Sequence, residues 1–150
     1  MLKPSKKLAL AVEAVVDIAL HSGLDPVQSQ DIAARLGLPR RYLEQVMQQL
    51  VREGILKGVR GPRGGYRLAR EQRRISVGDV FRVVQGDEPA EEAGIASGSE
   101  LGHRIMVPFW GELEEELMRR LDAVTVEDLC ERAAAAGLRG EQTPPPDFII

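Results

Sequence analysis

Side chains able to hydrogen-bond to nucleic-acid bases gather on one side of a predicted helix that runs from about Pro39 to Glu53. That side carries Arg41, Glu44, Gln45, Gln48 and Arg52, and the opposite side carries Leu43, Val46, Met47 and Leu50. In the major groove of DNA, Arg binds guanine, Gln pairs with adenine and Glu accepts a hydrogen bond from cytosine. The helix could therefore read base edges, although an amphipathic helix with a merely solvated face shows the same pattern.

A short basic turn rich in glycine follows this helix. Residues 60–65 read Arg-Gly-Pro-Arg-Gly-Gly and join two predicted strands, Ile55–Val59 and Tyr66–Ala69. A glycine-rich tip can approach a DNA backbone closely, and either of its arginines could enter a narrow minor groove. Residues 35–74 hold 11 Lys and Arg against 3 Asp and Glu, a net charge of +8 that attracts a polyanion. A basic hairpin that only aids solubility is the alternative.

Three helices and a two-stranded ribbon are expected to position these side chains. A first helix is predicted from Lys6 to Ser22, and a second begins at Ser29, a good N-cap residue, and ends at Gly37. After the ribbon, Ser76 and the aspartate three residues later have the pattern of a capping box for a fourth helix. This order predicts a winged helix-turn-helix domain over residues 1–85, in a mainly α fold with a small β-wing.

The rest of the chain differs in charge and in pattern. Residues 1–85 carry a net charge of +7 and the remainder carries −10, which indicates two separate tasks. We expect a loop over residues 86–104, a long helix to about Val124 with a short closing helix over residues 105–137, and an extended tail over residues 138–150. The long helix has a short heptad-like seam made of Trp110, Leu113, Leu117, Leu121 and Val124.

Composition excludes several kinds of site. The single cysteine, Cys130, rules out a disulfide framework and any cysteine-only metal site within one chain, and we expect it to be a small core residue rather than a redox switch. His21 and His103 are too few and too far apart to predict a metal site, and no catalytic constellation is visible, so we expect no enzyme. The apolar stretch from Leu8 to Leu20 is too short to cross a bilayer, and without a signal peptide the chain is expected to be cytoplasmic.

Several stretches of sequence carry a resemblance to a known family. They are Tyr42-Leu43-Glu44-Gln45, the run RGPRGGYRLAR at residues 60–70, Ile75-Ser76-Val77-Gly78-Asp79-Val80, Trp110, and Thr125-Val126-Glu127-Asp128-Leu129. Over roughly residues 6–132 the chain resembles the Rrf2 family of bacterial transcription regulators. The resemblance implies a homodimer that crosses its long helices and binds a roughly palindromic operator. It also implies that Arg41 and Glu44 meet bases in the major groove and that Arg60 enters the minor groove.

Three departures from the family pattern bear on the cofactor and on the operator. Cluster-binding members carry three cysteines before the tryptophan, whereas residues 86–109 contain none, and Arg104 and Val107 stand where ligands are expected. Because an iron–sulfur cluster needs thiolates, we predict that the chain binds no such cluster and no other cofactor. Leu8–Val12 replaces the family's Gly-Arg-Tyr-Ala-Val, and Pro39 replaces a capping serine, which bears on the operator sequence more than on DNA binding.

These observations predict a transcription regulator, acting as a repressor, that binds double-stranded DNA as a homodimer. A small-molecule or protein effector and oxidation of Cys130 stay open as the signal, and no membrane partner is expected. The residues expected at DNA are Lys7, Arg40, Arg41, Tyr42, Glu44, Gln45, Gln48, Arg60, Gly61, Arg63, Gly64 and Gly65. A winged-helix module that docks an acidic partner protein is the alternative interpretation.

Overall fold

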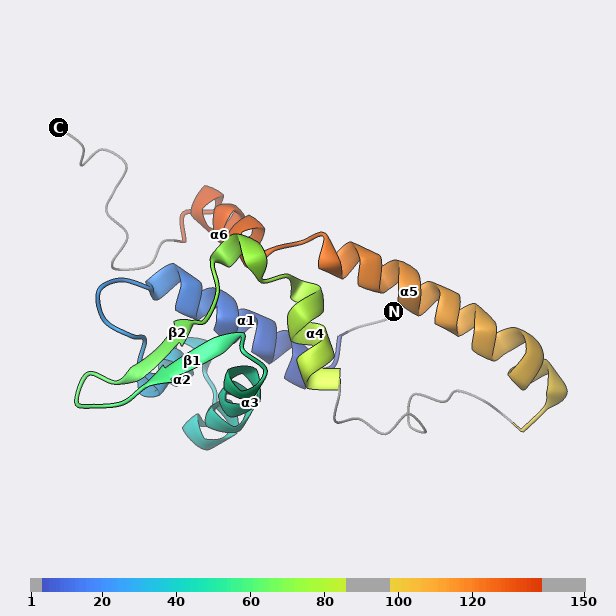
Figure 1. Ribbon diagram of the computed structural model, residues 1–150, viewed down its shortest axis with the longest axis horizontal. Coiled ribbons are helices and arrows are strands. Elements are labelled where there is room, and N and C mark those ends of the chain that lie inside the picture. Colours follow the sequence, from blue (N-terminus) through green and yellow to red (C-terminus); the bar gives the residue numbers. More distant parts are fainter. Residues whose placement is uncertain (1–3, 86–97, 139–150) are drawn as a thin grey trace.

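The computed structural model describes residues 4–85 and 98–138, which form a mainly helical fold with one small antiparallel sheet. The elements are α1 (Lys6–His21), α2 (Ser29–Leu36), α3 (Arg40–Arg52), β1 (Leu56–Val59), β2 (Gly65–Leu68), a 3-10 turn η1 (Gln72–Arg74), α4 (Val77–Gln85), a π-helical turn η2 (Gly102–Met106), α5 (Val107–Asp122) and α6 (Val126–Ala135). Figure 1 shows α1 to α4 gathered around the β1–β2 hairpin, while α5 extends away from them. The architecture is the predicted winged helix-turn-helix with a long additional helix.

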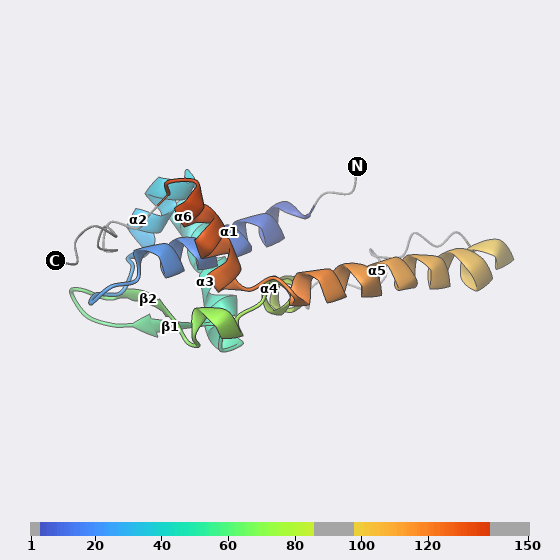
Figure 2. The same cartoon turned by 90° about the horizontal axis from the view of Figure 1, so that it is seen from above.

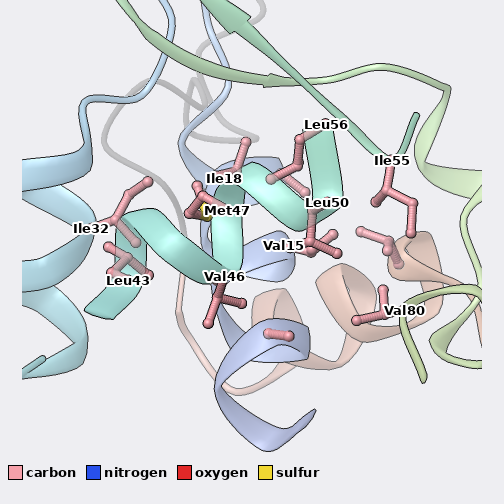
Figure 3. Close-up of a cluster of buried hydrophobic side chains, with 14 of the residues drawn as sticks. Val15, Ile18, Ile32, Leu43, Val46, Met47, Leu50, Ile55, Leu56 and Val80 are labelled. Atoms are coloured by element: carbon pink, nitrogen blue, oxygen red, sulfur yellow. The ribbon is translucent and has the colours of Figure 1, made fainter. Parts of the chain in front are cut away.

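The core lies where α1, α2, α3, α4 and β1 meet. Their apolar faces supply the buried side chains, and Figure 3 shows Val15, Ile18, Ile32, Leu43, Val46, Met47, Leu50, Ile55, Leu56 and Val80 pointing into one cluster. Fully burying such a side chain contributes about 1.5–3 kcal/mol. The apolar stripe of α3 is therefore fixed in the core, and its polar stripe faces outward.

The wing contains one more pairing than the sequence predicted. In the hairpin, Leu56 pairs with Leu68 and Val59 pairs with Gly65. Val27, just before α2, forms an isolated antiparallel bridge to Tyr66, with N–H···O distances of 3.0 Å and 2.8 Å. The bridge ties the wing to the start of the helix-turn-helix.

The predicted N-cap of α2 is wrong. Ser29 is the first residue inside the helix, and Gln28 precedes it without a side-chain cap. The Ser29 hydroxyl instead donates a hydrogen bond to Glu44 of α3, at 3.1 Å. The Ser29 hydroxyl, which the local pattern assigned to the cap of α2, is thus engaged in a tertiary contact with α3.

Helical structure in the C-terminal part begins earlier than the sequence predicted. Residues 100 and 101 are already helical, and the N–H of Gly102 donates to the hydroxyl of Ser99 at 3.0 Å, so the predicted loop over 86–104 is too long. The helix then widens into the π-turn η2, where the N–H of Val107 bonds to the carbonyl of Gly102. We attribute the widening to Pro108, which lacks an N–H and crowds the carbonyl four residues before it. Residues 86–97 and the predicted tail after residue 138 lie outside the described residues.

The C-terminal end of α5 is held against the winged-helix body by a β-bridge and an ion pair. A second isolated bridge joins Ser76 to Thr125, and the Arg82 guanidinium makes a bidentate pair with the Asp122 carboxylate at 2.8 Å and 2.7 Å. The predicted capping box at Ser76 is confirmed, and a matching box at Thr125 starts α6. From there α6 packs back onto α1, whereas α5 buries none of its residues and protrudes from the body in both views (Figures 1 and 2). None of the described helices is both long and apolar enough to cross a bilayer.

Candidate nucleic-acid interface

An open groove of about 790 Å³ lies between the wing and the first turns of α2 and α3. Its walls bring together residues far apart in the chain: Gln28, Ser29, Gln30, Arg40, Val51, Gly58, Val59, Arg60, Gly61, Pro62, Gly64, Gly65 and Tyr66. In Figure 1 the hairpin and α3 lie on the side of α1 opposite to α6. The start of α3 and the arginine-bearing tip of the wing therefore share one face of the molecule.

The predicted polar face of α3 is exposed. Arg41, Gln45 and Gln48 are open to solvent, because Leu43, Val46, Met47 and Leu50 of the same helix are buried on the other side. Tyr42 packs partly against the core. Lys7 lies in the first turn of α1 and, like Arg41, Gln45 and Gln48, is not among the residues that line the groove. The structure thus presents three of the predicted base-reading side chains together.

Glu44 is held in place by two side chains. The Nε–H of Arg40 donates to Glu44 Oε1 at 2.9 Å, and the hydroxyl of Ser29 donates to the same oxygen at 3.1 Å. Sequence reasoning assigned Arg40 to DNA and missed the role of Ser29. The spacing of Arg40 and Glu44, four residues apart on one helix, was the available signal for their pairing.

Tyr66 completes the polar side of the groove from the wing. Burial raises the pKa of the Tyr66 phenol, and the nearby Glu44 carboxylate raises it further, while Arg40 opposes both effects. The phenol therefore stays neutral in the physiological range and keeps its hydroxyl proton. It can donate a hydrogen bond, as neutral tyrosines do.

The glycines of the wing have folding roles that the structure makes explicit. Gly61 has a φ of 117°, a left-handed conformation that favours glycine, and its carbonyl accepts from the N–H of Gly64 at 2.9 Å. A Cβ on Gly64 would lie 2.5 Å from the carbonyl oxygen of Val59. These contacts shape the turn and leave Arg60 and Arg63 exposed at its tip.

Part of the basic run is used inside the fold. Arg67 donates to the carbonyls of Gly23 and Leu24, and Arg70 donates to the carbonyl of Gly54 at 3.2 Å. Arg35 makes a bidentate pair with the buried Asp17 of α1, at 3.0 Å and 2.9 Å. Because Arg35 is paired with a carboxylate, and Arg67 and Arg70 donate to backbone carbonyls, the net charge of residues 35–74 overstates the charge available on the face that bears the groove.

The apolar seam of α5 is open along most of its length. Trp110, Leu113 and Leu117 are 37%, 39% and 50% exposed. Leu121 is half-buried, and Val124 follows the end of the helix, where its carbonyl accepts from Val77 at 2.9 Å. The last two seam residues thus lie at the junction with the body.

The donor groups do not fit an iron–sulfur cluster. A cluster is held by several thiolates, and the chain has one cysteine, Cys130, half-buried in α6. Burial raises the pKa of its thiol, with Glu127 as a second cause, so the thiol stays protonated. Within residues 4–85 and 98–138, His, Cys, Asp and Glu side chains form no group of three that could hold a metal ion. The ring nitrogen Nδ1 of His21 is hydrogen-bonded to the carbonyl oxygen of Asp17, at 2.8 Å.

Comparisons with known proteins find relatives among transcriptional regulators. The family model Rrf2, described as iron-dependent transcriptional regulator, matches residues 4–132. The chain is 37% identical to the HTH-type transcriptional regulator IscR of Xenorhabdus nematophila over 120 residues, which are 79% of this chain and 73% of that protein. Among solved structures, T. potens IscR matches with a TM-score of 0.74 and 35% identity, covering 96% of this chain and 94% of that one. The B. subtilis global cysteine regulator CymR matches with a TM-score of 0.71 and 31% identity, covering 88% and 98%.

Proposed function

Because this chain belongs to the Rrf2 family of DNA-binding transcriptional regulators, we propose that it acts as a homodimeric repressor on a palindromic operator. The observation that carries the proposal is the groove that joins Arg40 at the start of α3 to Arg60 at the wing tip. A helix in the major groove and an arginine in the adjacent minor groove require this arrangement on one face.

Each part of this face has a distinct task in the proposal. Arg41, Gln45 and Gln48 project from α3 and supply donors and acceptors for base edges. Arg60 and Arg63 at the wing tip supply charge for a narrow minor groove and for phosphates. Contacts to phosphate give affinity and salt dependence, whereas contacts to base edges give sequence preference.

The open seam on α5 supports the homodimer. A contiguous apolar stripe on a protruding helix is typical of a protein–protein interface, and a second copy would cover it symmetrically. A two-fold dimer presents two copies of the α3–wing face, which matches a palindrome. We place this activity in the cytoplasm, where bacterial DNA lies.

The regulatory signal is proposed to be something other than an iron–sulfur cluster, because the chain offers one thiol. A small molecule or a partner protein would take that role. The protein purified under anaerobic conditions is expected to be colourless. A visible absorption band with bound iron would refute this part of the proposal.

Selection of bound sequences from random duplex DNA tests the proposal directly. We expect an enriched palindrome, and affinity for it that falls steeply with salt. Arg41→Ala and Arg60→Ala should each weaken binding by about ten- to a hundredfold in a gel-shift titration, with the fold intact. Arg132→Ala, which removes an exposed charge from α6 on the opposite side, is the matched control.

The outcomes separate DNA recognition from its alternative. Equal binding of the palindrome and of random duplex would favour a winged-helix module that docks an acidic protein. Unchanged affinity of both arginine variants would refute the assigned face even if an operator is found.

A further inference from the structure

Three polar side chains from two helices, Ser29, Arg40 and Glu44, contact one another beside the groove, and two of their three hydrogen bonds end on the same oxygen of Glu44. We propose that Ser29 and Arg40 are positioning residues that fix the Glu44 carboxylate as an acceptor and so restrict the base it meets. The inference rests on the proposed function and specifies the class of base that this site selects, namely one that offers an amino group in the major groove.

The contacts form a closed triangle. Ser29 Oγ donates to Glu44 Oε1 at 3.1 Å, and the Nε–H of Arg40 is shared between Glu44 Oε1, at 2.9 Å, and Ser29 Oγ, at 3.2 Å. Both partners approach Oε1, which leaves the second oxygen, Oε2, as the one to meet a base. A glutamate anchored in this way keeps one orientation, whereas a free glutamate samples several rotamers.

The anchor itself is rigid because of where Ser29 lies. Its residue is 8% exposed, and it sits in the first turn of α2, two residues after the Val27 bridge to the wing. A buried hydroxyl on a helix that is tied to the sheet has little freedom to move. The position of Glu44 is thus set by the wing and by α2 together, although Glu44 belongs to α3.

Charge explains why a carboxylate is tolerated on this face. A carboxylate near phosphates is repelled, and the Arg40 guanidinium at 2.9 Å compensates its charge. The paired carboxylate keeps its acceptor character. It accepts from the amino group of cytosine or adenine and opposes the acceptor atoms of guanine and thymine at the same place.

The inference distinguishes positioning from base contact for Arg40. Its Nε–H is engaged with Glu44 and Ser29, and through this group Arg40 orients Glu44, which is a role separate from any contact of its two terminal nitrogens with DNA. Loss of Arg40 or Ser29 should therefore relax the preference at one base pair. It should not abolish recognition of the rest of the operator.

Binding to a set of operator variants tests the inference. The operator selected by the wild-type chain is changed to each base pair at each position of the half-site, and competition binding measures the preference. Glu44→Ala identifies the position that Glu44 reads. Ser29→Ala, Arg40→Met and the charge-retaining Arg40→Lys are then measured alone and combined with Glu44→Ala, with far-UV circular dichroism and thermal unfolding as checks of the fold.

Controls separate the positioning role from the loss of a hydroxyl or of a charge. Ser22→Ala removes an exposed serine whose hydroxyl donates to the carbonyl of Ile18, at 2.8 Å, away from the groove. Arg132→Met removes a positive charge from α6. Neither control should alter the preference at any position.

We expect the Ser29 and Arg40 variants to lower the preference at the Glu44 position by about tenfold, with a smaller effect on affinity for the best operator. In the Glu44→Ala background they should have no further effect on preference, because the group they position is gone. Unchanged preference at that position, or an effect that adds to that of Glu44→Ala, would overturn the inference alone. A wild-type chain that selects no sequence would overturn the proposed function, and the inference with it.

Discussion

Replacement of Gly65 by alanine should detach the wing from the start of α2. A Cβ at this position would lie 2.3 Å from the carbonyl oxygen and 2.6 Å from the carbonyl carbon of Val27. Because these are backbone atoms, no side-chain rotation can relieve the clash, and the two hydrogen bonds between Val27 and Tyr66 must lengthen or break. Each contributes about 0.5–1.5 kcal/mol, so their loss costs about 1–3 kcal/mol.

Alanine also restricts the unfolded chain, which offsets about 0.4–1 kcal/mol of that loss. The net expectation for Gly65→Ala is a free energy of unfolding lower by about 1–2 kcal/mol. With a urea dependence of about 1–3 kcal/mol per molar, typical of small proteins, the unfolding midpoint should fall by about 1 M. Urea titration followed by far-UV circular dichroism measures this shift.

Gly58→Ala is the matched control, since it changes the same residue type on the paired strand. A Cβ at Gly58 meets no atom within 4 Å, so this variant should be as stable as the wild type or slightly more stable. If Gly65→Ala and Gly58→Ala unfold at the same urea concentration, the close approach of Val27 does not constrain Gly65. The reasoning about the wing would then be refuted.

Three further predictions concern the Arg35–Asp17 ion pair, the apolar seam of α5 and the Arg82–Asp122 ion pair. Arg35→Met should lower the free energy of unfolding by about 2–4 kcal/mol, since it leaves the buried Asp17 carboxylate without its bidentate partner; a loss below 1 kcal/mol in a denaturant titration would contradict this. Trp110→Ala should weaken self-association by about thirtyfold or more in sedimentation equilibrium, and an unchanged dissociation constant, or a monomeric wild type, would exclude the seam as the interface. The Arg82 guanidinium holds the pKa of Asp122 below its usual range, so the stability from this pair is present above that range and is lost as the pH falls through the lowered pKa. The difference in urea midpoint between the wild type and Asp122→Asn should therefore shrink in acid, and a difference that is constant with pH would argue against the pair.

Local patterns predicted most of the helices and the capping box at Ser76. The predicted apolar face of α3 is confirmed because the residues that define the pattern are the ones that fill the core. The capping boxes at Ser76 and Thr125 were predictable because each joins residues only three positions apart. Such contacts form whatever the rest of the fold does.

Contacts between distant residues could not be predicted in this way. Ser29 has the composition of a helix cap, yet its hydroxyl bonds to Glu44, 15 residues later. Val27 pairs with Tyr66 although α2, α3 and β1 lie between them in the sequence, and neither segment alone carries a pattern that predicts the bridge. The glycine at position 65 suggested close approach to DNA, whereas its packing against the chain's own backbone is sufficient to require it.

The Arg82–Asp122 ion pair and the Ser76–Thr125 bridge, which hold the end of α5 against the body, have a mechanical consequence. The 16 residues of α5 span about 24 Å at 1.5 Å per residue, and within residues 4–85 and 98–138 the ion pair and the bridge to the body, through Arg82 and Ser76, lie at its C-terminal end. A pivot of about 10° at the fixed end sweeps the other end through roughly 4 Å, by the geometry of a lever of that length. In the proposed homodimer, two such helices packed against each other would set the distance between the two α3 helices, so the spacing of the half-sites would depend on the angle at this fixed end.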